Sequence, residues 1–112
     1  MASMALAFPI LPGKTEAARQ FARACMGARR AELAASYREH GITREEWFLQ
    51  EGPTAAQVIV YFEADDPAHS LRMWAASQAP FDRWFKAQAR DCTGIDFDQP
   101  LGALPEPVLA WP

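Results

Sequence analysis

Two side chains suited to proton transfer lie near the middle of the chain, His69 and Tyr61. An imidazole with an ordinary pKa near 6.5 can act as a general base without much tuning. We therefore predict His69 and Tyr61 as the catalytic candidates if the protein is an enzyme. The simpler alternatives are an exposed histidine at the start of a helix and a tyrosine that belongs to the core.

A second group of residues has the chemistry of a small-molecule pocket. Arginine can anchor a carboxylate or phenolate, and aromatic side chains can form the walls around it. The expected ligand-binding residues are Arg29, Arg30, Tyr37, Trp47, Gln50 and Trp84. The alternative for the arginine pair is a solvated helix face, and the alternative for Trp47 is a core position.

Other kinds of site have little support in the sequence. His40 and His69 share no metal-ligand spacing, and Cys25 and Cys92 lie in apolar helical contexts typical of buried thiols. The segment 12–15 ends in Gly-Lys-Thr but lacks the first glycine of a phosphate-binding loop. We therefore predict no metal and no cofactor.

Composition limits the partners and the compartment. The chain has 112 residues and a net charge of −3, whereas a protein that neutralises phosphates carries a basic face. It contains no apolar run of membrane-spanning length, and no basic segment precedes its first apolar stretch. The expectation is a cytoplasmic protein without nucleic-acid or membrane partners.

The first half of the chain predicts a strand, a helix and a hairpin. An apolar run at residues 4–11 contains Pro9, which favours an edge strand because proline lacks an N–H group. Apolar residues at helical spacing predict a helix over 15–40, which Gly27 could break into two segments. Strands are expected at 45–50 and 57–64.

The second half predicts two helical segments and an extended tail. Asp66-Pro67 is a helix start, Pro80 interrupts the helix near residue 78, and Gly94 ends the second segment. The proline-rich tail at 96–112 could add a last edge strand at 107–111.

This order predicts a single α+β domain over 1–112, ferredoxin-like, with a β-α-β-β-α-β antiparallel sheet and its helices on one face. The strand at 57–64 is apolar on both faces, and a chain this short has nothing left to cover the second one. We therefore expect a homodimer with its two sheets face to face, a dimeric α+β barrel.

The sequence also resembles a known family. The resemblance spans residues 8–111 and is carried by PILPGKTEAARQF, the pair Arg29–Arg30, GITREEWFLQ, VIVYFEADDP, PFDRWF and GID. These segments are similar to a family of small bacterial proteins with no assigned function, within the dimeric α+β-barrel superfamily. That superfamily contains cofactor-free enzymes, ligand binders and heme-degrading monooxygenases, so the resemblance implies a fold but no single reaction.

The expected function is the binding of a small aromatic or carboxylate molecule between sheet and helices, with or without cofactor-free catalysis. One alternative is a noncatalytic dimerisation or stress-type module with a filled interior. A second alternative is a heme-binding, monooxygenase-like protein. Heme-degrading relatives use a histidine, an asparagine and a tryptophan, and this chain has His69, Trp47 and Trp74 but no asparagine.

Overall fold

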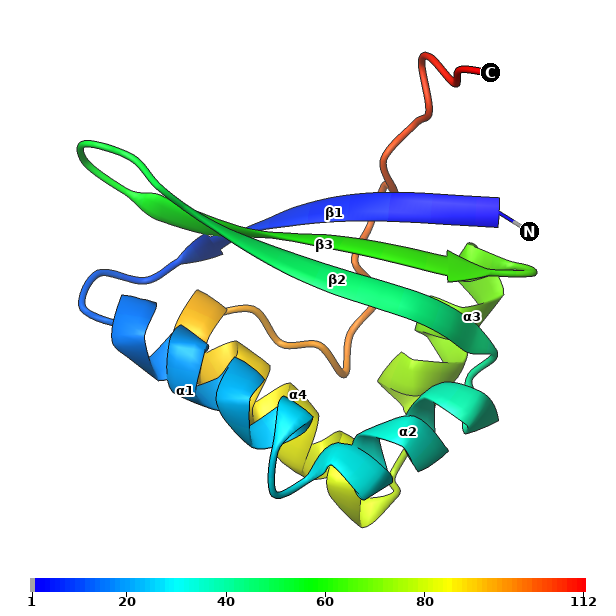
Figure 1. Cartoon of the computed structure of the whole chain (residues 1–112), viewed down its shortest axis with the longest axis horizontal. Helices are drawn as coiled ribbons and strands as arrows, with labels where there is room; N and C mark the ends of the chain where they lie inside the picture. Colours follow the sequence, from blue (N-terminus) through cyan, green and yellow to red (C-terminus); the bar gives the residue numbers. More distant parts are fainter. Residues whose placement is uncertain (1) are drawn as a thin grey trace.

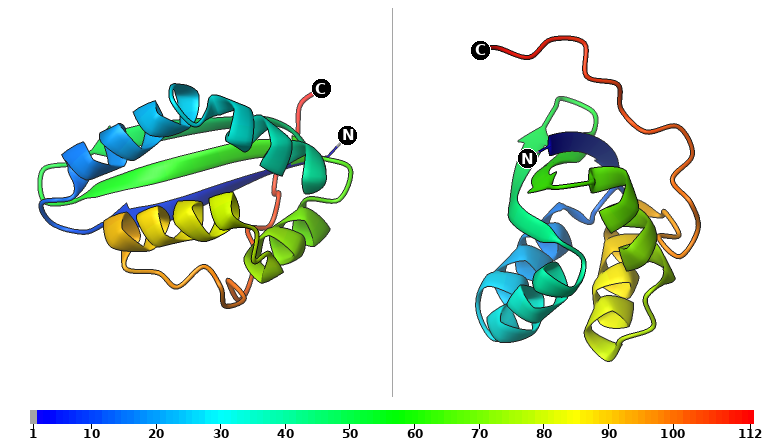
Figure 2. Two further views of the ribbon diagram at one scale, coloured as in Figure 1. Left: turned by 90° about the horizontal axis from the view of Figure 1, so that it is seen from below. Right: turned by 90° about the vertical axis from the view of Figure 1, so that its right-hand side faces the viewer.

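The structure is a computed structural model that describes residues 2–112. Over these residues, three strands form one antiparallel sheet in the order β1-β3-β2. Four helices lie together on one face of that sheet, so the opposite face is open (Figures 1 and 2). In chain order the elements are β1 (Ala2–Ile10), α1 (Thr15–Met26), α2 (Arg30–Glu39), β2 (Ile42–Glu51), β3 (Ala56–Ala64), α3 (Pro67–Ala76) and α4 (Pro80–Thr93). None of the described helices is long and apolar enough to cross a membrane.

The central strand is β3, which corresponds to the apolar segment predicted as a strand over 57–64. Because side chains alternate along a strand, Val58, Val60 and Phe62 share one face, which meets the helices, and Tyr61 lies on the other, open face. β1 is an edge strand and contains Pro9 opposite Gln57. The missing N–H group of Pro9 is tolerated there.

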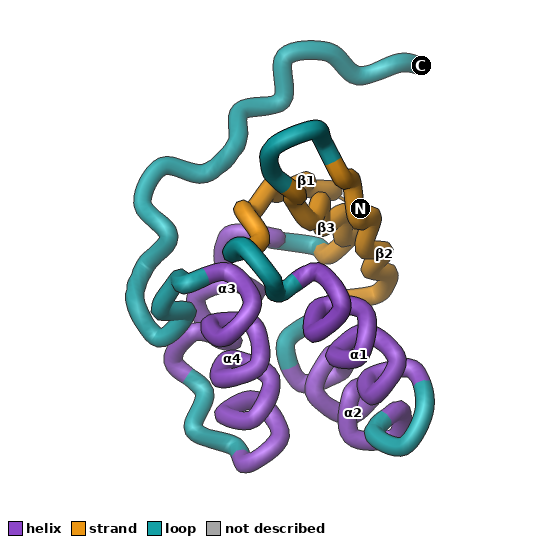
Figure 3. Tube along the Cα trace, turned by 90° about the vertical axis from the view of Figure 1, so that its left-hand side faces the viewer, coloured by secondary structure: helices purple, strands orange, loops and turns teal. Residues whose placement is uncertain are grey.

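The long helix expected over 15–40 is two helices, α1 and α2. The chain turns at Gly27, where the backbone leaves the helical region at φ −110° and ψ −106°. The Gly27 N–H still donates to the Ala24 carbonyl oxygen, which closes the last turn of α1. The two helices form one of the two pairs beneath the sheet, and α3 and α4 form the other (Figure 3).

Both predicted boundaries of the second helical region are confirmed. The Asp66 carboxylate accepts a hydrogen bond from the His69 backbone N–H at 3.1 Å, and Pro67 occupies the first helical position. α4 ends at Gly94, whose φ of +76° is the left-handed conformation that favours glycine.

The predicted last strand at 107–111 is wrong for this chain, because the described residues beyond Gly94 contain no strand. Leu101 and Leu104 pack beside Leu6, Phe62 and Ala64, and the chain then passes the β1 edge and projects beyond the open face (Figure 1). Pro105 and Pro107 remove two backbone donors that a strand would use. The domain is therefore a three-stranded α+β unit with an extended tail.

The interior contains two hydrophobic clusters rather than one. A larger cluster joins α1, α2 and α4 and is built from Phe21, Cys25, Leu33, Phe81 and Phe85. A smaller one, Leu6, Phe62 and Ala64, lies against the helix-facing side of the sheet. Members of both clusters line the space between sheet and helices, where the candidate site lies.

Candidate functional site

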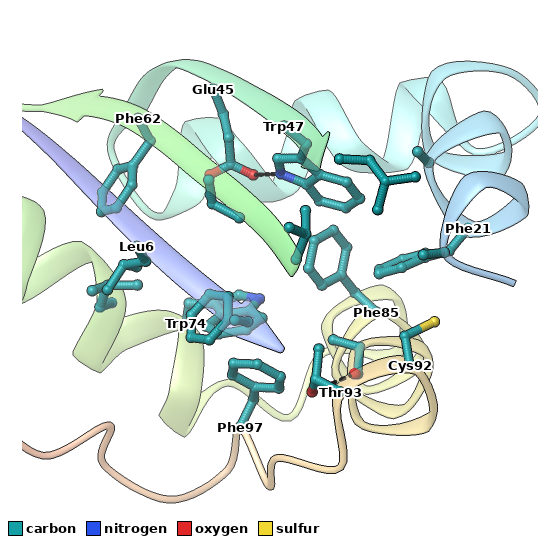
Figure 4. A pocket seen from close by; sticks show the side chains of 18 of the residues that line it. Leu6, Phe21, Glu45, Trp47, Phe62, Trp74, Phe85, Cys92, Thr93 and Phe97 are labelled. Atoms are coloured by element: carbon teal, nitrogen blue, oxygen red, sulfur yellow. Dashed lines mark hydrogen bonds between the residues drawn. The ribbon is translucent and has the colours of Figure 1, made fainter. Parts of the chain in front are cut away.

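A cavity of about 190 Å³ lies between the sheet and the two helix pairs (Figure 4). Each strand contributes a row of alternate side chains to its wall, because side chains along a strand point to opposite faces in turn. β3 contributes Val58, Val60 and Phe62, and β1 contributes Leu6 and Phe8. The lining is therefore mostly aliphatic and aromatic.

Aromatic rings from five segments form one wall of the cavity. Trp47 on β2 lies 5.2 Å from Phe21 and 5.6 Å from Phe85, measured between ring centroids. Trp74 on α3 lies 5.7 Å from Phe85 and 5.6 Å from Phe97. These edge-to-face and tilted contacts hold the rings in place, which gives the cavity a defined shape.

One carboxyl group, that of Glu45, reaches this apolar wall from β2. Its orientation depends on a β-bulge at the start of the strand: Ile42 pairs with Ala64 and Arg44 with Glu63, so Thr43 is the extra residue. After the bulge, Glu45, Trp47 and Leu49 line the cavity. Without it, the face of Ile42 would be shared by the residues at even positions, and Glu45 would face outward.

Two donors hold the Glu45 carboxyl in place. The Tyr37 hydroxyl on α2 and the Trp47 indole N–H, at 2.9 Å, both donate to Glu45 Oε2. The other oxygen, Oε1, has no hydrogen-bond partner among the described residues, and the carboxyl group lies in the cavity wall (Figure 4). Glu45 therefore offers one free polar position to a molecule in the cavity.

The surroundings of Glu45 and Tyr37 shift the pKa of both groups. Burial raises the pKa of Glu45 above its usual range, because the charged form loses its hydration, and the hydrogen bonds from Tyr37 and Trp47 offset only part of this effect. Burial and the neighbouring Glu45 carboxylate also raise the pKa of Tyr37. Both groups consequently favour their neutral forms.

The cavity offers little positive charge. Arg19 is the lining residue with a cationic side chain, and its guanidinium is shared between Glu16 at 3.3 Å and Glu51 at 3.2 Å. The Thr93 hydroxyl, also in the lining, donates to the Ala89 carbonyl oxygen of its own helix. Glu45 thus remains the chemically distinctive group of the lining.

The residues predicted from sequence are distributed over several places. Tyr37 and Trp47 line the cavity. Arg29 and Trp84 contact each other away from it: the Arg29 guanidinium lies 4.1 Å from the Trp84 ring centroid and pairs with Glu32 at 3.1 Å. Arg29 is therefore held by a cation–π contact and an ion pair.

The other four predicted residues lie outside the cavity lining. His69 is exposed in the first turn of α3, and Arg30 is exposed at the start of α2. The Tyr61 hydroxyl donates to Glu63 at 2.6 Å on the open face of the sheet, and Gln50 accepts from Gln57 at 2.8 Å. The structure does not bring these four side chains together.

Sequence reasoning missed Glu45 as a site residue. The signal present in the sequence is the alternation Glu45, Trp47, Leu49, which places one carboxyl group on the same face as two apolar side chains. The sequence alone does not show that this face is the inner one, because the bulge at Thr43 decides it.

A second buried polar group, also missed, fastens the helices to one another. Asp82 on α4 is 2% exposed, lies 2.9 Å from His40 Nε2, and accepts hydrogen bonds from the Ser36 and Ser77 hydroxyls. None of these side chains lines the cavity. We assign this cluster a structural role, because it connects α2 to the start of α4.

Fold and cavity define a small α+β protein with an apolar pocket between a three-stranded sheet and its helices. The chain belongs to a family of unknown function, DUF6176, whose model matches residues 1–110. Searches of curated proteins and of solved structures gave no significant match. The family membership agrees with the resemblance to a small family without an assigned function.

Proposed function

We propose that the protein binds a small, neutral, mostly apolar molecule with an aromatic ring in the cavity between sheet and helices. The observation that carries this proposal is the cavity itself, which aromatic rings and strand side chains surround and which contains the Glu45 carboxyl. Apolar walls with a few fixed polar groups are typical of small-molecule sites.

The size and charge of the cavity narrow the ligand class. Its volume of about 190 Å³ exceeds the ~150 Å³ of an apolar protein cavity that takes up benzene, so a single substituted ring fits. A carboxylate is disfavoured because it would lose its hydration among apolar side chains, and the cationic residue in the lining, Arg19, already pairs with Glu16 and Glu51. Of the two ligand classes expected from sequence, we therefore propose the aromatic one.

The alternatives are less well supported by the geometry. A purely structural module would have side chains filling the space that the cavity occupies. Heme binding would need an axial ligand, and the part of the lining that the structure describes contains neither His40 nor His69. The cavity is also smaller than the roughly 300–1,000 Å³ of sites for larger ligands.

A cavity-filling substitution tests the proposal. Ala89 on α4 lines the cavity, and Ala89→Leu would occupy part of its volume. With α-methylstyrene as the probe, we expect saturable binding to the unaltered protein, measured by calorimetry or by the fluorescence of Trp47 and Trp74, and at least about tenfold weaker binding to Ala89→Leu.

The matched control is Ala87→Leu, an exposed position on the same helix. It adds the same volume outside the cavity, so its affinity should equal that of the unaltered protein. No saturable binding to the unaltered protein, or equal loss in both variants, would contradict the proposal.

We further propose that two copies associate through the open sheet faces. β1-β3-β2 is the order of a ferredoxin-like sheet without its fourth strand, and no helix covers its outer side (Figure 2). Phe48 on that side is 52% exposed, and Ile59 lies opposite it on β3. Exposed apolar side chains on an uncovered sheet face favour association with a second copy.

A further inference from the structure

We infer that the ligand of the cavity is a neutral carbonyl compound, an aromatic ketone or aldehyde, whose oxygen accepts a hydrogen bond from the Glu45 carboxyl group. This inference rests on the proposed function and narrows it. It depends on the different hydrogen bonding of the two carboxyl oxygens of Glu45.

The first step concerns the position of the acidic hydrogen. Glu45 Oε2 accepts from both the Tyr37 hydroxyl and the Trp47 N–H, so its two lone pairs are in use. The hydrogen of the neutral acid then belongs on Oε1. Glu45 is part of the cavity lining, and Oε1 has no partner among the described residues. The neutral acid therefore presents a donor to the cavity.

The second step concerns the surroundings of that donor. Glu45 pairs across the sheet with Phe62, and Ile42 and Trp47 line the cavity on the same strand. Among residues 2–112, no cationic side chain pairs with the Glu45 carboxyl, and burial favours its neutral form. A ligand that covers this donor must replace the hydrogen bond that it can make to water, and a carbonyl oxygen on the ligand would do so.

The third step separates ligand classes. A carbonyl oxygen only accepts hydrogen bonds. It can therefore pair with a donor on Oε1 but not with the apolar side chains of the cavity wall. A hydroxyl group both donates and accepts, so it would pair with either form of Glu45. A preference for a carbonyl over a hydrocarbon of the same shape is thus the signature of the inferred site.

The experiment compares acetophenone with α-methylstyrene, in which a methylene group replaces the carbonyl oxygen. At pH 4.5, the ordinary pKa of a glutamate, above which burial holds the pKa of Glu45, acetophenone should bind the unaltered protein about fivefold to tenfold more tightly. Equal affinities would overturn the inference while leaving the proposed function intact. If neither probe binds, the proposed function fails as well.

Two variants connect the preference to Glu45. In Glu45→Gln the amide oxygen can accept from Tyr37 and Trp47, which places the amide N–H₂ at the position of Oε1, so the preference for acetophenone should persist. In Glu45→Leu the donor is absent, so the two probes should bind equally. A Glu45→Leu protein that retains the preference would overturn the inference, and loss of the preference in Glu45→Gln would do the same if Glu45→Leu does not fold.

Discussion

At the scale of single residues, the buried Glu45 carboxyl couples stability to pH. Its pKa in the folded protein lies above the ordinary value of 4.5, chiefly because burial removes water from the charged form. Below pH 4.5 both the folded and the unfolded chain bind this proton. As the pH rises above that value, the unfolded chain releases the proton first, so the free energy of unfolding falls until the folded group also ionises.

Glu45→Gln removes this titration and should remove its effect on stability. Between pH 4.5 and about pH 8 we expect the free energy of unfolding of the unaltered protein to fall relative to that of Glu45→Gln. Urea unfolding of both proteins across this range measures the difference. Parallel pH profiles would show that burial does not shift the pKa of Glu45.

At the scale of secondary-structure elements, the Asp82 cluster connects segments that are distant in the sequence. Asp82 lies in the first turn of α4, whereas Ser36 belongs to α2, His40 follows that helix, and Ser77 lies between α3 and α4. Burial alone would raise the pKa of Asp82, but hydrogen bonds from Ser36, Ser77 and His40 outweigh it and lower the pKa. The charged form is therefore stabilised in the folded protein.

Asp82→Ala should be strongly destabilising, because it leaves the buried His40 and the half-buried Ser36 and Ser77 without their acceptor. We expect a loss of about 2–4 kcal/mol in the free energy of unfolding at neutral pH. Because the pKa of Asp82 is lowered from 3.8, this difference should shrink as the pH falls below that value. Chemical denaturation at neutral and acidic pH measures both effects.

Arg83→Ala is the control for Asp82→Ala, since Arg83 is the next residue on α4 and is exposed. It should change stability by no more than about 0.5 kcal/mol. If Asp82→Ala lowered the free energy of unfolding as little as the control does, the cluster would contribute little to stability.

At the scale of the whole molecule, the helices of one chain cover only one face of the sheet and leave the other open. The proposed dimer gives a native mass of twice 12.5 kDa by sedimentation or light scattering. Phe48→Arg places a charge in the proposed interface and should yield the monomer mass. Met26→Arg, at an apolar residue on α1 that is 58% exposed, should leave the dimer intact. A monomeric unaltered protein would contradict the dimer.

The sequence by itself determined the elements whose signals are local. The cap at Asp66 followed by Pro67, the helix end at Gly94 and the edge position of Pro9 each follow from one or two residues. The alternation in β3 is equally local, and it places Val58 and Phe62 on one face of the strand, although which face meets the helices does not follow from it. Tyr37 and Trp47 were found as candidate pocket residues because their chemistry suits a pocket wall.

The tertiary structure decided which side chains meet. The pairing of β2 with β3 places the bulge at Thr43, and that single extra residue turns Glu45 into the cavity beside Tyr37 on α2. The strand predicted at 107–111 does not form, because a strand must pair with a neighbouring edge through its own backbone N–H groups. The prolines of the tail lack these groups. Register and burial depend on contacts between distant segments, so local patterns cannot specify them.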